Sequence, residues 1–108
     1  MLTTYTSVLA RRVRITTDFA TLPYEAGWAR EAVFFTQVEG DHPPLTVTTE
    51  ISPDGINWLR RGEAQQLTEE GSIIDSPMTV FGNWVRLAIQ GATEARPARV
   101  LVHLSLKG

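Results

Sequence analysis

The sequence predicts an all-β protein, an antiparallel β-sandwich of jelly-roll-like type with about seven or eight strands. Apolar and polar residues alternate in several short segments, turn-forming residues recur about every 8–12 residues, and no segment sustains an apolar period of about 3.6 residues. A chain of 108 residues, 43% of them hydrophobic, is long enough for one hydrophobic core and too short for two. We therefore expect a single domain.

The beginning of this domain, residues 1–30, is expected to be an N-terminal arm with a first strand and an aromatic loop, ahead of a β-sandwich body at 31–108. Apolar residues alternate with Arg and Thr near residues 12–17, which predicts a strand there. Residues 8–10 are compatible with a strand, a short helix or an extended arm.

An aromatic loop is expected at residues 21–30, because Pro23 and Gly27 interrupt any regular pattern. The loop carries Tyr24 and Trp28 and is expected to fold back over a face or an edge of the sheet. Trp28 is interpreted as a side chain that fills the core, in preference to one that forms a contact surface, because aromatic side chains dominate core burial.

A second strand is predicted over residues 31–39, followed by a proline-containing loop at 40–44. Apolar residues occupy both faces of this strand: Ala32, Phe34 and Val38 on one, and Val33 and Phe35 on the other. A strand that is apolar on both faces is either central in its sheet or covered by another subunit.

Residues 45–58 have the pattern of a strand, a tight turn and a return strand that begins at Ile56. Proline presets φ in the turn, aspartate bonds to the nearby backbone, and glycine tolerates positive φ. Trp58 stands where a hairpin normally places its core anchor. The turn itself consists of Ser52, Pro53, Asp54 and Gly55.

Further strands are predicted in the second half of the chain. Residues 63–68 have the pattern of a short polar edge strand, and residues 72–81 that of a strand broken at Ser76-Pro77. Alternation is most regular over residues 84–90 and 99–107. Turns and loops are expected between these strands at 69–71, 82–83 and 91–97.

Charge is distributed unevenly along the chain. The net charge is −2, with a balance of +2 over residues 1–30 and −4 over residues 31–108. A basic arm ahead of an acidic body suits packing on this chain or on a neighbouring subunit, and it differs from the basic surface of a nucleic-acid-binding protein. Nine of the ten basic residues are Arg, which favours geometrically fixed pairs such as those at interfaces.

The first twenty residues contain no apolar run of the length that a signal peptide or a membrane span requires. We therefore expect a protein that is made in, and stays in, the cytoplasm of the cell that makes it, with no membrane partner and no nucleic-acid partner. The chain has no cysteine, which excludes disulfides and cysteine-rich zinc sites.

Catalysis is the function class that the sequence supports least. His42 and His103 lie far apart in the sequence, and neither belongs to a recognisable motif. The sequence has no glycine-rich phosphate loop, no nucleophile elbow and no H-E-x-x-H zinc pattern. Asp54 fits a turn better than a calcium loop. We expect no enzyme, no catalytic residue, no metal and no cofactor.

The segment from Pro44 to Trp58, which ends in S-x-D-G-x-x-W, resembles a stretch of small β-sandwich structural proteins of tailed phages and prophage-like regions. The likeness continues through a turn at 68–71, the strand Trp84-Val85-Arg86-Leu87 and the loop that begins Gly91-Ala92-Thr93, and it covers about residues 31–108. Members of this group are head-decoration proteins, tail-associated proteins or uncharacterised proteins. The resemblance implies no catalytic residue.

The preferred hypothesis is a non-enzymatic structural subunit of a phage or phage-derived particle, located in the virion as a capsid decoration or tail-associated protein. Its expected partners are further copies of the chain, in a homo-oligomer, and a capsid or tail protein. Residues 1–20 are expected to add a strand to a neighbouring subunit or to run under it. The candidate interface residues are Arg11, Arg12, Arg14, Tyr24, Trp28, Phe35, Trp84 and Arg86.

The alternative hypothesis is a carbohydrate- or surface-binding β-sandwich module. Such modules bind through exposed aromatic rings, and this reading depends on Trp28 and Trp84. The rings available are Tyr5, Tyr24, Trp28, Trp58 and Trp84.

Overall fold

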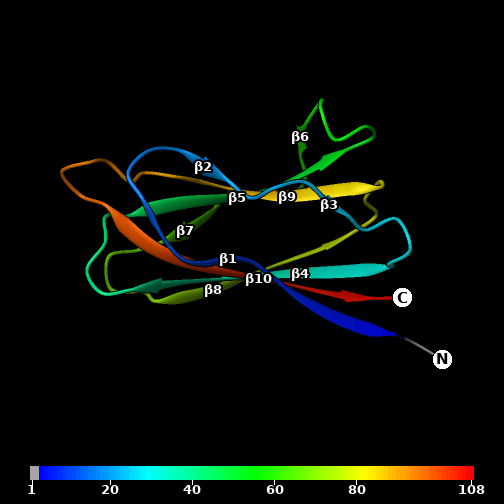
Figure 1. Cartoon of the computed structure of the whole chain (residues 1–108), viewed down its shortest axis with the longest axis horizontal. Helices are drawn as coiled ribbons and strands as arrows, with labels where there is room; N and C mark the ends of the chain where they lie inside the picture. The colour runs from blue at the N-terminus through cyan, green and yellow to red at the C-terminus, as the bar shows by residue number, and fades with distance from the viewer. Residues whose placement is uncertain (1–2) are drawn as a thin grey trace.

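A computed structural model of the chain describes residues 3–108, which form two antiparallel β-sheets packed face to face and contain no helix (Figure 1). The long strands follow the alternation of apolar and polar residues in the sequence. The strands are β1 (Thr4–Ile15), β2 (Phe19–Ala20), β3 (Tyr24–Glu25), β4 (Glu31–Glu39), β5 (Leu45–Ser52), β6 (Leu59–Arg60), β7 (Gln65–Leu67), β8 (Ile73–Thr79), β9 (Trp84–Gln90) and β10 (Ala98–Lys107).

The order of the strands confirms the predicted jelly-roll-like sandwich. One sheet has four strands in the order β1-β10-β4-β8. The other has six, with β9 and β5 at its centre, β2 and β3 paired with β9, and β6 and β7 paired with β5. If β2 with β3, and β6 with β7, are each taken as one interrupted edge strand, the ten pieces reduce to eight strands. Consecutive strands lie in different sheets, except that β5 is followed by β6 and β7 in the same sheet.

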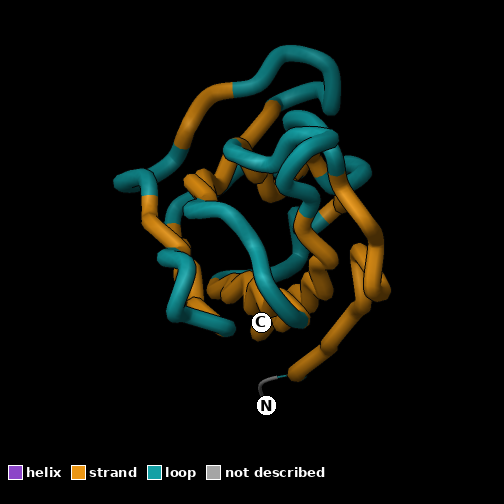
Figure 2. The backbone as a smooth tube through the Cα atoms, turned by 90° about the vertical axis from the view of Figure 1, so that its left-hand side faces the viewer, coloured by secondary structure: helices purple, strands orange, loops and turns teal. Residues whose placement is uncertain are grey.

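The core lies between the two sheets, where the inward side chains of all long strands meet. Figure 2 shows the backbone of the two sheets turned by 90° from the view of Figure 1. Strict alternation places every second residue of β9 and β10 in this core, as the sequence predicts. The largest fully buried apolar side chains are Phe34, Leu45, Leu67, Leu87, Ile89, Leu104, Leu106, Val47, Val85, Val100 and Val102.

The N-terminal segment belongs to the four-stranded sheet. β1 pairs with β10 from Thr4 opposite Lys107 to Ile15 opposite Ala98, with register shifts after Val8 and Ala10. Residues 4–15 pair with β10 of their own chain and so belong to the sandwich, where β1 is an edge strand. The pairing of residues 1–20 with a neighbouring subunit stays a prediction. Residues 1–2 lie outside the described residues.

Two details of the later strands also differ from the prediction. β8 runs without a break through Pro77, because β8 is an edge strand whose proline nitrogen needs no ladder partner. The return strand after the turn begins at Leu59, so Ile56 to Trp58 lie in a longer loop.

The loops gather at the two ends of the sandwich. The start of β1, the C-terminus, the aromatic loop at 26–30 and the turn at 52–58 lie at the right-hand end of Figure 1, and the loops at 40–44 and 91–97 lie at the left-hand end. Each end therefore brings together residues that are far apart in the sequence.

Candidate functional site

The turn after β5 is built around the side chains of Ser52 and Asp54. The Ser52 hydroxyl accepts hydrogen bonds from the backbone N–H groups of Asp54 at 3.2 Å and Gly55 at 2.8 Å, and donates one to the Asp54 carboxylate at 2.9 Å. That carboxylate also accepts from the backbone N–H groups of Ile56 and Asn57, both at 2.8 Å, and from the Asn57 side chain at 2.7 Å. Hydrogen bonds from Asn57 and Ile56 hold the pKa of Asp54 well below its usual range.

The turn folds over the outer surface of the six-stranded sheet. Gly55, with φ of 79°, lies above the indole of Trp84, where an added Cβ would meet the ring at 3.5 Å. Trp84 is half-buried beneath it. The residues predicted as the structural turn therefore act together as expected, and they also cover one candidate interface residue.

Trp58 is not the predicted core anchor. Its ring lies on the outer surface of the sheet, with the guanidinium carbon of Arg86 4.3 Å from the ring centroid. Arg86 also donates from Nε to the carboxylate of Glu50 at 2.5 Å, across the paired strands β5 and β9. The core between the sheets is already filled by the strands themselves, so the longer loop leaves Trp58 stacked outside it.

A second group of aromatic residues lines an open groove at one edge of the sandwich. Tyr5 of β1, Tyr24 of β3 and Trp28 of the following loop surround a space of about 440 Å³, with Thr3 beside them. Tyr5 is 52% exposed and Trp28 49% exposed, so the prediction that Trp28 fills the core is wrong. The physical reason is position: Trp28 follows the edge strand β3, where no second layer covers it.

Tyr24 is the least exposed ring of this aromatic groove. Burial raises the pKa of its phenol above the usual value, and a hydrogen bond with Ser7 opposes this shift. The phenol therefore stays neutral and available as a hydrogen-bond donor at physiological pH. The groove thus combines apolar ring faces with neutral hydroxyl groups.

The outward surface of the four-stranded sheet, here called the four-strand face, is unusually apolar. Antiparallel sheets normally present polar residues to water on the side away from the core. Val8 is 38% exposed and Ile73 54% exposed on this face, and the candidate residue Phe35 is half-buried near its centre. The apolar members of the face are Val8, Val33, Phe35, Ile73, Pro77 and Leu101.

The opposite outer surface shows the usual pattern. Most outward positions of its central strands β5 and β9 are occupied by polar and charged residues, namely Thr46, Thr48, Glu50, Arg86 and Gln90, and the others on β9 are Trp84 and Ala88. The two outer surfaces of the sandwich therefore differ in polarity, because the four-strand face is the more apolar.

Charged residues flank the four-strand face. Arg12, which has φ of 50° where β1 shifts register, donates from Nε to Glu39 at 2.8 Å. Arg99 donates to the backbone carbonyl of Arg12 at 3.2 Å, and Arg14 lines a shallow depression beside it. Arg11 is exposed on the same strand. The predicted basic segment thus lies along the edge of this face.

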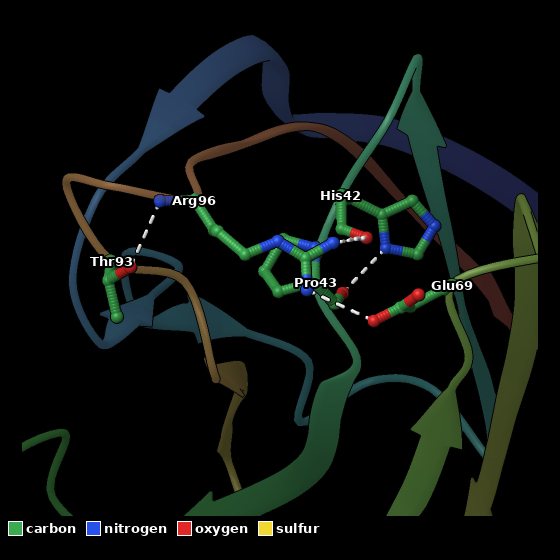
Figure 3. Close-up of polar contacts among 5 residues, drawn as sticks. All are labelled: His42, Pro43, Glu69, Thr93 and Arg96. Carbon is green, nitrogen blue, oxygen red and sulfur yellow. Dashed lines mark hydrogen bonds and ion pairs between the residues drawn. The ribbon is translucent and has the colours of Figure 1, made fainter.

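At the opposite end from the aromatic groove, Arg96 joins three loops (Figure 3). Its guanidinium donates to the Glu69 carboxylate at 3.0 Å and to the backbone carbonyl of His42 at 3.2 Å. Its backbone N–H donates to the Thr93 hydroxyl at 3.0 Å. Because the Arg96–Glu69 ion pair is about half-exposed, it contributes little to stability.

His42 has a structural role in the same region. The side chain is buried, with Nδ1 2.7 Å from the carbonyl oxygen of Pro43 and Nε2 2.8 Å from that of Gly71. His103, in contrast, is half-buried in the middle of the four-strand face. Neither histidine adjoins a nucleophile or a second titratable group in the described hydrogen bonds.

Residues 3–108 hold no group of three or more His, Cys, Asp or Glu side chains placed to bind a metal ion. The part of the chain that the structure describes also has no helix long and apolar enough to cross a membrane.

The candidate interface residues thus separate into four places. Tyr24 and Trp28 share the aromatic groove, Trp84 and Arg86 lie beneath or beside the turn, Phe35 lies in the four-strand face, and the early arginines lie along its edge. Sequence reasoning missed Val8, Ile73 and Pro77, because only the pairing of distant strands places them beside Phe35.

Comparison with solved structures identifies proteins of similar fold. The crystal structure of PBSX exported protein XepA matches with a TM-score of 0.73 and 10% identity, over 94% of this chain and 36% of that chain. The SPBc2 prophage-derived protein YomS matches with a TM-score of 0.64 and 11% identity, over 100% and 96% of the two chains. A Bacillus endospore appendage protein, from a family of disulfide-linked pili, matches with a TM-score of 0.54 and 13% identity, over 98% and 83%.

This chain thus spans about a third of XepA and almost all of YomS. At these identities the matches establish the fold alone. No protein of curated function matches the sequence. A family model does match, over residues 28–107, and the chain belongs to that family, described as Domain of unknown function (DUF6385).

Proposed function

We propose that the chain is a non-enzymatic structural subunit of a phage or phage-derived particle, where it serves as a capsid decoration or tail-associated protein. The observation that carries this proposal is the apolar four-strand face, with exposed Val8 and Ile73 around half-buried Phe35. An apolar patch on a sheet surface marks a place where another protein packs. The expected partners are further copies of the chain and a capsid or tail protein.

The structural comparisons support the particle part of this proposal. XepA is described as a PBSX exported protein and YomS as a prophage-derived protein, and YomS has nearly the same extent as this chain. A small jelly-roll sandwich suits assembly through its surfaces.

The experiment that tests this function is co-purification with particles. Cells that encode the chain are treated to release phage-like particles, which are separated on a density gradient and probed with an antibody against the purified protein. The chain should sediment with the particles at a constant ratio to their major protein across the peak fractions. Recovery only among free proteins at the top of the gradient would overturn the proposal.

A second candidate function is carbohydrate or surface binding, favoured by the aromatic groove of Tyr5, Tyr24 and Trp28. Exposed rings with neutral hydroxyl groups suit the alternating apolar and polar surfaces of a sugar. Trp84 does not belong to this groove, because the turn covers it.

The test uses the fluorescence of a protein in which Trp58 and Trp84 are replaced by Phe, so that Trp28 is the remaining indole. Polysaccharide binding should shift this emission saturably, and Tyr5→Ala should abolish the shift. Emission that is unmoved by a panel of bacterial cell-wall and capsular polysaccharides would contradict sugar binding.

A further inference from the structure

We propose that the four-strand face binds a second copy of this chain, through a two-fold axis that lies in the plane of the face and runs along the strands. This inference rests on the proposed function in one respect, that the chain works as an assembled subunit. Beyond that function, it specifies the partner as a second copy, the contact surface as the four-strand face, and the relative orientation of the two copies.

Basic and acidic residues lie on different strands of the four-strand face. Basic residues lie on the β1 and β10 side, where Arg14, Arg99 and Lys107 point outward. Acidic residues lie on the β4 and β8 side. These are Glu31, Glu39 and Asp75, each exposed, of which Glu39 also pairs with Arg12 of its own chain. The face is therefore basic on the β1 and β10 side and acidic on the β4 and β8 side, while its apolar residues lie on all four strands. The charged residues of β10 and β4 lie at the two ends of the face, and Asp75 of β8 lies level with Val8, His103 and Phe35.

This arrangement is complementary to itself in one orientation. Rotation about an axis parallel to the strands places β10 of one copy over β4 of the other, and β1 over β8. Because Lys107 pairs across the sheet with Glu31, and Arg99 with Glu39, the rotation also places Lys107 of each copy over Glu31 of the other. The contact is isologous, so each such pair occurs twice.

The other in-plane two-fold orientation is disfavoured by the same charges. An axis across the strands places β10 over β10, which brings Arg99 of one copy to Lys107 of the other. Like charges placed opposite each other suppress a wrong arrangement. The charge pattern thus selects the orientation as well as the partner.

The residues at the centre of the four-strand face also suit a contact between two copies. In the selected orientation His103 of each copy lies over Phe35 of the other, with Leu101 and Val33 on either side. Apolar and aromatic residues at the centre and charged residues at the rim are the usual anatomy of a protein interface. Sheets whose strands run in nearly the same direction also pack well face to face.

The area of the four-strand face also fits a dimer interface. Four strands at a spacing of about 4.8 Å and nine residues at about 3.4 Å each give a face of roughly 600 Å² per copy. The dimer would then bury roughly 1,200 Å² in total, the lower bound for a specific and stable interface. We therefore expect a reversible dimer that dissociates on dilution.

The experiment uses two variants of the whole chain. The acidic variant carries Arg99→Glu and Lys107→Glu, and the basic variant carries Glu31→Lys and Glu39→Lys. In either homodimer the facing charges are alike, whereas in a mixed dimer every facing pair is opposite. Each variant alone should dimerise at least about tenfold more weakly than the natural chain, and an equimolar mixture should recover the dimer.

A matched control separates this effect from general attraction between oppositely charged proteins. Arg60→Glu with Thr48→Glu and Gln90→Glu, and Glu25→Lys with Glu94→Lys, produce the same changes of net charge away from the four-strand face. These control variants should each dimerise like the natural chain. Recovery of the dimer in the mixture also shows that both interface variants fold.

Sedimentation velocity of the natural chain, of each variant and of the mixtures gives the result. A dimer from the natural chain and from the interface mixture, with monomers from each interface variant, is the expected outcome. A natural chain that stays monomeric, interface variants that dimerise alone, or a mixture that stays monomeric would each overturn the proposed dimer. A monomer that still sediments with particles overturns the dimer alone, and a dimer absent from particles overturns the proposed function alone.

Discussion

The guanidinium carbon of Arg86 lies 4.3 Å from the centroid of the Trp58 ring. This contact joins the loop after β5 to the centre of β9, and the ion pair of Arg86 with Glu50 joins β9 back to β5. The side chains of Arg86 and Glu50 are only 27% and 20% exposed, so solvent screens their contact less than it screens the other ion pairs. Side chains of this chain therefore cover part of the outer surface of the six-stranded sheet.

Trp58 and Arg86 should therefore be energetically coupled. In a double-mutant cycle with Trp58→Leu and Arg86→Met, we expect a coupling free energy of about 0.5–1 kcal/mol, the usual strength of a cation–π contact near a surface. Urea unfolding of the four proteins measures it. Glu50→Gln, which removes the ion pair and keeps the stacked ring, is the matched control. Strictly additive effects of the two changes would show that the stacking does not stabilise the fold.

Asp54 should make stability depend on acid pH. The pKa of its carboxyl is lowered in the folded protein by hydrogen bonds from Asn57 and Ile56, so the folded state binds the proton less readily than the unfolded state. The stabilisation is fully present above pH about 4, the usual aspartate value, and is lost as the pH falls from there toward the lowered value. Asp54→Asn should remove this part of the acid dependence, whereas Asp18→Asn at an exposed position should leave it intact. Urea midpoints measured from pH 7 down to acid conditions test this, and parallel curves for the natural chain and Asp54→Asn would contradict it.

Two buried threonines should respond oppositely to replacement by valine. Thr36 is fully buried on β4, and its hydroxyl oxygen finds no hydrogen-bond partner within the described residues. Thr49 is buried on β5, and its hydroxyl donates to the carbonyl of Arg61. Thr36→Val should raise the free energy of unfolding by about 1 kcal/mol, and Thr49→Val should lower it by about 1–2 kcal/mol. Thermal unfolding of both variants checks the signs. Equal losses would mean that the Thr36 hydroxyl is satisfied in the folded protein.

His42 should matter more to stability than Arg96. His42→Phe keeps the ring volume but removes the ring nitrogens that lie within hydrogen-bond distance of the Pro43 and Gly71 carbonyl oxygens, which should lower the free energy of unfolding by about 1–2 kcal/mol. Arg96→Met removes a half-exposed ion pair and one longer hydrogen bond, with an expected loss below about 1 kcal/mol. Chemical denaturation ranks the two variants. A larger loss for Arg96→Met would show that the guanidinium holds the three loops together.

The long strands could be predicted because their signal is local. Alternation of apolar and polar residues fixes which side chains of 31–39, 84–90 and 99–107 face the core, and the structure places them accordingly. The turn at Ser52 and Asp54 could also be predicted from the sequence, because serine and aspartate side chains in a turn form hydrogen bonds with the nearby backbone.

What could not be predicted depends on which strands become neighbours. The two-residue strands β2, β3 and β6 are too short to show any period, and they exist only because β9 and β5 offer them an edge. Pro77 interrupts a pattern in the sequence but not in the structure, because its strand lies at the edge of the sheet. The burial of Trp28 and Trp58 likewise depends on which layers cover them.

The proposed assembly depends most directly on the apolar centre of the four-strand face. The decisive measurement is native mass by light scattering over a dilution series of the natural chain, of Phe35→Glu and of the control Thr48→Glu, which places the same charge on the outer surface of the other sheet. The natural chain and Thr48→Glu should rise from 12.0 kDa toward twice that mass as concentration increases, while Phe35→Glu stays at 12.0 kDa. A natural chain of 12.0 kDa at every concentration, or a Phe35→Glu curve that follows the natural one, would contradict the account.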